Sequence, residues 1–173
     1  MNVPNKLTVL RIVLVPVCLF LAGYGVFYAA AGVFVLAALT DTLDGYIARK
    51  KHLVTNFGKF ADPIADKILV LSMMIVLSYQ RMLPVWLPII LAFRELMVDG
   101  LRMVAAEQGR VVAAGWSGKV KTFSQMVLIV LVLVLNNSVL TLVLSILVAA
   151  LTLYSGGEYF WKLRDLFMQD FGK

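Results

Sequence analysis

Residues 41–67 read DTLDGYIARKKHLVTNFGKFADPIADK, and they decide how this chain can fold. They hold four aspartates and five Lys or Arg side chains, whereas the segments on both sides are almost entirely apolar. A carboxylate without a partner is energetically costly in an apolar surrounding. The chain therefore has to turn these acids toward an internal cavity, and its apolar segments have to enclose that cavity.

The composition is that of a membrane protein. Hydrophobic residues make up 61% of the chain, charged residues 15%, and the mean hydropathy is +0.90. Soluble chains are only about 45 to 50% apolar and about a quarter charged. We therefore expect a single membrane domain that covers residues 1–173. The lone Cys18 offers neither an internal disulfide nor a zinc site.

Six apolar segments have about the length that a membrane span needs, which is roughly 20 helical residues for about 30 Å of hydrocarbon. They run approximately over residues 7–23, 26–48, 58–80, 84–106, 120–135 and 139–161. Turn residues or charges separate them. The predicted fold is all-α, a polytopic membrane protein with six transmembrane helices and a short N-terminal interfacial segment at residues 1–6.

The basic residues predict the orientation, because Lys and Arg collect on the cytoplasmic side of a membrane. With the N-terminus inside, six spans put both termini in the cytoplasm, and Arg81 is the only one of the 16 Lys and Arg on the outer side. The net charge of +6 then lies on one face, where it attracts anionic lipid. We expect a protein of the cell membrane whose site faces the cytoplasm, with no nucleic-acid partner.

The aspartates form two pairs with helical spacing. Asp41 and Asp44 are three residues apart near the inner end of the second span, and Asp62 and Asp66 are four apart near the inner start of the third. Each pair shares one helix face. Four converging carboxylates need positive charge among them, and all-oxygen coordination suits Mg²⁺ or Mn²⁺. The alternative is a set of structural ion pairs with the nearby basic residues Arg49, Lys59 and Lys67.

Small residues and a proline accompany these acids. Gly45, Ala48 and Gly58 remove side-chain bulk beside the carboxylates, so that a ligand could approach the backbone. Pro63 suits the first turn of a helix and therefore predicts that Asp62 lies near a helix N-terminus, the end of the helix dipole that favours anions.

The pattern Asp41-x2-Asp44-Gly45-x2-Ala48-Arg49-x8-Gly58-x3-Asp62-x3-Asp66 resembles the full signature of the CDP-alcohol phosphatidyltransferases, with all eight fixed positions present. The resemblance implies a six-helix membrane fold that is usually dimeric. It also implies a reaction in which the hydroxyl of an alcohol attacks the β-phosphate of a CDP-linked lipid and CMP leaves.

The same resemblance implies roles for individual residues. The four aspartates would hold Mg²⁺ or Mn²⁺, as two ions, and Asp66 would also act as general base. The residues expected to shape the CDP-diacylglycerol site are Thr8, Gly45, Ala48, Arg49 and Gly58.

The second half of the chain holds cations that the signature does not explain. Arg94 and Arg102 are eight residues apart and lie near one helix face. We expect Glu95 and Asp99 to pair with these arginines, which leaves two further cations without obvious partners, Lys119 and Lys121. Several cations beside a nucleotide-lipid site predict that the acceptor alcohol is anionic, most simply a phosphate ester.

Four stretches resemble bacterial phosphatidylglycerophosphate synthases: NVPNKLTVLRIVLVPV, RELMVDGLR, GKVKT and LTLYSGGEYFWKLRDLF. This resemblance implies that CDP-diacylglycerol and sn-glycerol 3-phosphate are the substrates in a step of anionic phospholipid synthesis. The acceptor phosphate would then be bound first by Arg102 and Lys119, and next by Arg94 and Lys121.

Other functions stay open at this point. The same chemistry could use inositol phosphate or phosphatidylglycerol as acceptor. A membrane prenyltransferase also holds a diphosphate with paired aspartates, but the small residues and Arg49 argue against it. A divalent-cation transporter would need access from both faces of the membrane, whereas every candidate acid here lies toward the inner side.

Overall fold

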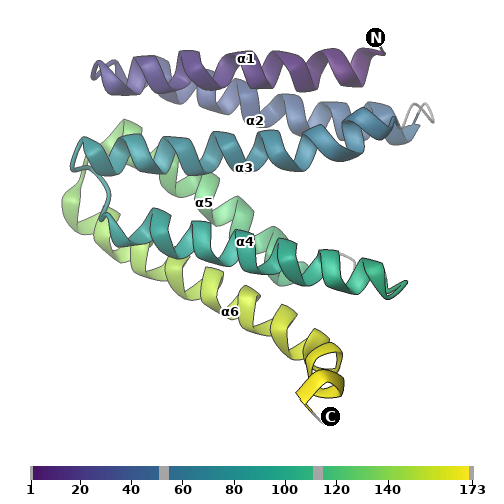
Figure 1. The fold of residues 1–173 in the computed structure, drawn as a ribbon. Helices are drawn as coiled ribbons and strands as arrows, with labels where there is room; N and C mark the ends of the chain where they lie inside the picture. Colours follow the sequence, from purple (N-terminus) through teal and green to yellow (C-terminus); the bar gives the residue numbers. More distant parts are fainter. Residues whose placement is uncertain (1, 51–54, 111–114, 172–173) are drawn as a thin grey trace.

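The chain folds into α-helices only, in a computed structural model that describes residues 2–50, 55–110 and 115–171 (Figure 1). Side chains at 3–4, 42–49, 56, 59 and 166–171 lie outside the described part. The described helices are α1 (Val3–Gly23), α2 (Phe27–Lys50), α3 (Asn56–Tyr79), α4 (Trp86–Glu107), α5 (Trp116–Leu135) and α6 (Ser138–Phe171). The predicted all-α class and the six predicted helices are confirmed for these residues.

Some helix bounds differ from the prediction. α1 begins at Val3 with a proline in its first turn, so residues 3–6 continue the first helix instead of forming a separate interfacial segment. α5 begins at Trp116, before the predicted residue 120, and α6 continues past Trp161 to Phe171. In both helices the extra turns carry polar and charged residues, which hydropathy does not count as part of a span.

The start of α3 corrects the prediction for Asp62. The Thr55 hydroxyl accepts a hydrogen bond from the Gly58 N–H at 3.0 Å and caps the helix, so that α3 begins at Asn56. Pro63 therefore lies inside α3 and does not mark its first turn. The prediction that Asp62 sits at a helix N-terminus is wrong.

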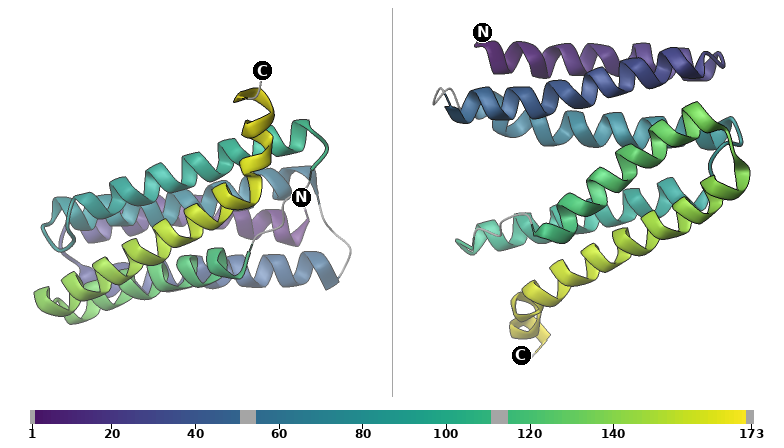
Figure 2. Two further views of the ribbon diagram at one scale, coloured as in Figure 1. Left: turned by 90° about the horizontal axis from the view of Figure 1, so that it is seen from below. Right: turned by 180° about the vertical axis from the view of Figure 1, so that it is seen from behind.

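The helices form two groups that diverge toward one end: α1, α2 and α3 make one group, and α4 and α6 make the other, with α5 in contact with both. α1, α2 and α3 lie side by side, α4 packs on α6, and α5 contacts α2, α3 and α6 (Figures 1 and 2). The two groups lie farthest apart where α2 and α4 end and where α3 and α5 begin, which we call the open end (Figures 1 and 2). At the opposite end Gln80 Nε2 donates to the Gly23 carbonyl at 2.6 Å and joins the α3–α4 turn to the α1–α2 turn.

Apolar side chains fill the bundle and also cover it. The main core includes Phe34, Met73 and Leu128, and a smaller cluster joins α4 to α6 near the open end. Large apolar residues such as Phe20 and Phe93 are exposed on the outside. An exterior this apolar is suited to lipid as the surrounding solvent.

Three segments are long and apolar enough to cross a membrane by length and composition, namely Asn5–Gly23, Trp116–Leu135 and Ser138–Asp165, with only the described residues considered. α2 contributes a shorter apolar segment, Phe27–Asp41. α3 and α4 carry more charged residues, and where those side chains point decides whether these helices can also span a membrane.

Candidate active site

A cavity of about 730 Å³ lies at the open end between α2, α3, α4, α5 and α6. Ten charged side chains line it: Asp41, Asp62, Asp66, Lys67, Arg94, Glu95, Asp99, Arg102, Lys119 and Lys121. The described aspartates of the signature and all four cations predicted for the acceptor therefore face one space. The members of this list that come from α3 and α4 therefore face the cavity.

Arg11 of α1 joins two of the aspartates. Its side chain is fully buried, and its Nη1 atom lies 2.8 Å from Asp41 Oδ1 and 3.0 Å from Asp66 Oδ1. The guanidinium thus links α2 to α3. Sequence reasoning used Arg11 only as a marker of orientation, although a cation inside an apolar span was a signal for a carboxylate partner.

The third described aspartate lies against two residues predicted for the CDP-diacylglycerol site. The Thr8 hydroxyl donates to Asp62 Oδ1 at 2.6 Å. A Cβ atom on Gly58 would lie 3.4 Å from Asp62 Oδ2 and 3.3 Å from the Thr55 hydroxyl, tighter than ordinary packing in the second case. A side chain at this position would therefore crowd the hydroxyl that caps α3 and touch the Asp62 carboxylate.

Four predicted residues, Asp44, Gly45, Ala48 and Arg49, belong to α2, but their side chains lie outside the described residues. Among the side chains that are described, no group of three His, Cys, Asp or Glu could hold a metal ion.

The chemistry of the described donors nevertheless fits a divalent cation. Asp41, Asp62 and Asp66 offer only oxygen, and Arg11 balances one of their three negative charges. Negative charge therefore remains for a hard cation to complete. Lys67, a candidate partner in the alternative of structural ion pairs, is engaged elsewhere, with Asp99 and Glu95.

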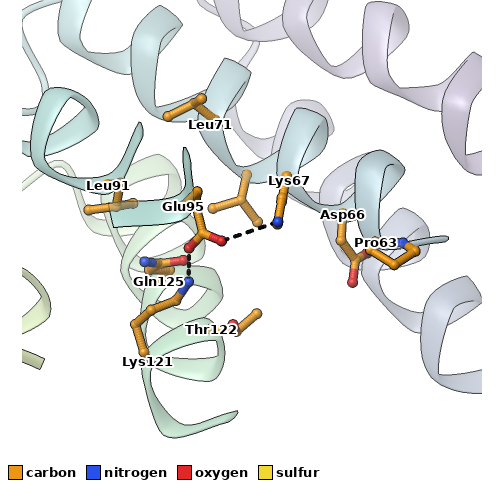
Figure 3. A pocket seen from close by; sticks show the side chains of 10 residues that line it. Pro63, Asp66, Lys67, Leu71, Leu91, Glu95, Lys121, Thr122 and Gln125 are labelled. Atoms are coloured by element: carbon orange, nitrogen blue, oxygen red, sulfur yellow. Dashed lines mark hydrogen bonds and ion pairs between the residues drawn. The ribbon is translucent and has the colours of Figure 1, made fainter. Parts of the chain in front are cut away.

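Glu95 lines a smaller cavity of about 160 Å³ and interacts there with Lys67 of α3 and Lys121 of α5 (Figure 3). One of its oxygens binds Lys121 Nζ and lies 3.3 Å from Arg94 Nη1, and the other lies 3.7 Å from Lys67 Nζ. The predicted pairing of Glu95 with Arg94 is confirmed, but Asp99 pairs with Lys67 and with no arginine whose side chain is described. Lys121 was predicted to have no obvious partner, but it binds Glu95. The position of α5 brings the Lys121 side chain within reach of this residue of α4.

Arg102 and Lys119 stand differently in the cavity. Neither forms an ion pair with a described carboxylate. Arg102 instead donates to the Tyr159 hydroxyl at 2.6 Å, and Lys119 is exposed at the cavity wall. These two cations therefore keep their charge available to an anion, whereas Arg94 and Lys121 share Glu95. Tyr159 is a residue that sequence reasoning missed, since a tyrosine in an apolar helix carries no charge signal.

A comparison with protein families finds that the CDP-alcohol phosphatidyltransferase profile matches residues 1–154. The chain belongs to this family. In this phosphatidyltransferase, therefore, the described aspartates of the family signature and the cations of α4 and α5 line a common cavity.

Curated relatives cover nearly the whole chain. The CDP-diacylglycerol–glycerol-3-phosphate 3-phosphatidyltransferase of Bacillus subtilis is 42% identical, over 93% of this chain and 94% of its own length. The protein of the same name in Pseudomonas fluorescens is 39% identical, over 94% of this chain and 87% of its own length. The one in Shigella flexneri is 38% identical, over 91% of this chain and 92% of its own length.

Proposed function

We propose that this phosphatidyltransferase moves the phosphatidyl group of CDP-diacylglycerol to sn-glycerol 3-phosphate, and releases phosphatidylglycerophosphate and CMP. The observation that carries the proposal is a single cavity with aspartates on one wall and, on another, Arg102 and Lys119, two cations that pair with none of the described carboxylates. Relatives named for this reaction, 38 to 42% identical to the chain, support the same acceptor.

The chain's own groups account for the proton transfer. Asp66 lines the cavity, and its bond to Arg11 fixes the orientation of the carboxylate. Asp66 takes the proton of the acceptor hydroxyl, the oxygen forms a bond to the β-phosphorus, and the bond from that phosphorus to the CMP oxygen breaks.

The metal belongs on the same wall. Asp41, Asp44, Asp62 and Asp66 would hold Mg²⁺ or Mn²⁺, as two ions, and the bound cations would neutralise the charge of the diphosphate. Thr8 and Gly58 adjoin Asp62, and together with Gly45, Ala48 and Arg49 they would shape the nucleotide side of the site.

The acceptor phosphate is assigned to the opposite wall. Arg102 and Lys119 bind it directly, while Arg94 and Lys121 stay close to Glu95 and add positive potential behind them. A neutral alcohol would leave Arg102 and Lys119 facing the cavity without a counter-charge. Phosphate esters therefore suit the site better than neutral or zwitterionic alcohols.

The protein is also proposed to span the cell membrane six times, with both termini and the cavity on the cytoplasmic side, and to form a homodimer as the family resemblance implies. Six spans are supported by α3 and α4, most of whose described charged side chains line the cavity. Arg81, in the turn at the end opposite the cavity, supports the orientation. A C-terminal tag should be cleaved by protease in inverted membrane vesicles and protected in right-side-out vesicles.

A panel of acceptors tests the reaction. Purified protein in CDP-diacylglycerol vesicles with Mg²⁺ should release CMP with glycerol 3-phosphate and not with inositol phosphate or phosphatidylglycerol, and EDTA should stop the release. Turnover with inositol phosphate alone would refute the acceptor and keep the family chemistry. Mn²⁺ uptake into vesicles without any CMP release would instead identify a transporter.

The base role of Asp66 has its own test. We expect Asp66→Asn to lower kcat by at least about 100-fold, because general base catalysis contributes roughly that much or more. Asp165→Asn is the matched control, since Asp165 is exposed on α6 and pairs only with its neighbour Arg164 among the described residues. Full activity in Asp66→Asn would show that another group takes the proton.

A further inference from the structure

Tyr159 of α6 lies where the elements that carry the proposed acceptor cations meet. Its side chain is only 3% exposed, packs with Val98, Leu101 and Leu163, and lines the large cavity. It belongs to the stretch 151–167, LTLYSGGEYFWKLRDLF. The proposed reaction uses aspartates of α2 and α3 and cations of α4 and α5, and it gives this stretch no role.

The hydroxyl of Tyr159 holds two of these elements at once. It accepts a hydrogen bond from Arg102 Nη2 at 2.6 Å and another from the Gly115 N–H at 3.2 Å. A phenol oxygen can accept from more than one donor. Gly115 is the N-cap of α5, and Lys119 follows one helical turn later. One oxygen therefore connects Arg102 of α4 to the start of the helix that carries Lys119.

The ring of Tyr159 adds a second restraint. The guanidinium carbon of Arg102 lies 5.1 Å from the ring centroid, and that of Arg94 lies 5.6 Å away. Both distances are within the range of a cation–π contact. The ring, which comes from α6, thus restricts the positions of both guanidinium groups. The Arg94 side chain is only 8% exposed.

The neutral character of this residue matters for anion binding. Glu95 fixes Arg94 and Lys121 with a carboxylate, which also cancels part of their charge. Tyr159 fixes Arg102 with a hydroxyl, which orients the guanidinium and leaves its full positive charge for a ligand.

We propose that Tyr159 is a positioning residue that sets Arg102 and the start of α5 in the geometry that binds the phosphate of the acceptor. It acts through these cations and not on the reacting atoms. The inference rests on the proposed function, because it assigns the acceptor phosphate to Arg102 and Lys119.

Tyr159→Phe tests this directly, because it keeps the ring and removes only the hydroxyl. We expect the KM for glycerol 3-phosphate to rise about tenfold, as for a lost hydrogen bond to a charged group. The kcat and the KM for CDP-diacylglycerol should stay within about twofold of wild type. Tyr159→Leu, which also removes the ring, should raise the acceptor KM further.

Two further measurements separate positioning from a general loosening of the fold. Inorganic phosphate should inhibit wild type in competition with the acceptor, and its inhibition constant should rise in Tyr159→Phe by the same factor as the KM. Tyr154→Phe is the matched control, since Tyr154 lies on the same helix with its side chain exposed and outside the large cavity. It should change none of these constants.

An unchanged acceptor KM in Tyr159→Phe, or a loss confined to kcat, would overturn the inference. If wild type rejects glycerol 3-phosphate but uses another phosphorylated alcohol, the proposed acceptor is wrong. The same KM comparison with that alcohol then still decides the role of Tyr159.

Discussion

At the scale of single residues, the site depends on a buried arginine as much as on its aspartates. Arg11 is fully enclosed and contacts both Asp41 and Asp66, which come from different helices. Removing one partner of a buried ion pair is strongly destabilising, because the remaining charges lose their compensation. Arg11 should therefore contribute to stability as well as to the orientation of the proposed base.

Arg11→Gln should lower the melting temperature of the metal-free protein by roughly 5 °C, less than for a fully buried ion pair, because Asp41 and Asp66 are partly exposed. Added Mn²⁺ should recover part of the loss, because a bound cation replaces the missing positive charge beside Asp41 and Asp66. Arg11→Lys, which keeps the charge, is the control and should melt closer to wild type. Equal melting temperatures for wild type and Arg11→Gln without metal would contradict this account.

At the scale of elements, the contact between α4 and α6 shapes the acceptor wall. A Cβ atom on Gly156 would lie only 3.2 Å from Arg94 Cγ, whereas a Cβ atom on the next residue, Gly157, would meet nothing within 4 Å. A larger residue at position 156 would therefore crowd the Arg94 side chain, whereas one at position 157 would not.

This pair of glycines makes a matched experiment. Gly156→Ala should displace Arg94 and raise the KM for glycerol 3-phosphate several-fold, because a 3.2 Å contact forces the side chain to move. Gly157→Ala should leave the KM unchanged and stabilise α6 slightly, since alanine is the better helix former. Equal effects of the two substitutions on the KM would contradict the packing described here.

The elements also show what sequence reasoning could and could not reach. The spacing of Arg94 and Arg102 correctly put both on one face of α4, because helical periodicity is a local property. The partner of Lys121 could not be predicted in the same way, because the contact of Lys121 with Glu95 depends on where α5 lies relative to α4 in the bundle. Pro63 was wrongly taken as a first-turn proline, because the residue that caps α3 is Thr55 and the helix begins at Asn56.

At the scale of the whole molecule, the described acids of the charged stretch, Asp41, Asp62 and Asp66, line a cavity between the helices of an otherwise apolar chain. Apolar segment lengths predicted six helices, because a run of about 20 apolar residues is typical of a helix that can span a membrane. They could not predict that two groups of helices diverge at one end, or that α6 completes the cavity with Tyr159. Those features depend on contacts between helices far apart in the sequence.

The most direct test of the central claim is to identify both products of one reaction. Purified protein, CDP-diacylglycerol vesicles, Mg²⁺ and radiolabelled glycerol 3-phosphate should give labelled phosphatidylglycerophosphate and CMP in equal amounts, measured by mass spectrometry and by label in the lipid phase. CMP release with no label in lipid, or no CMP release at all with active-site aspartates intact, would contradict the account.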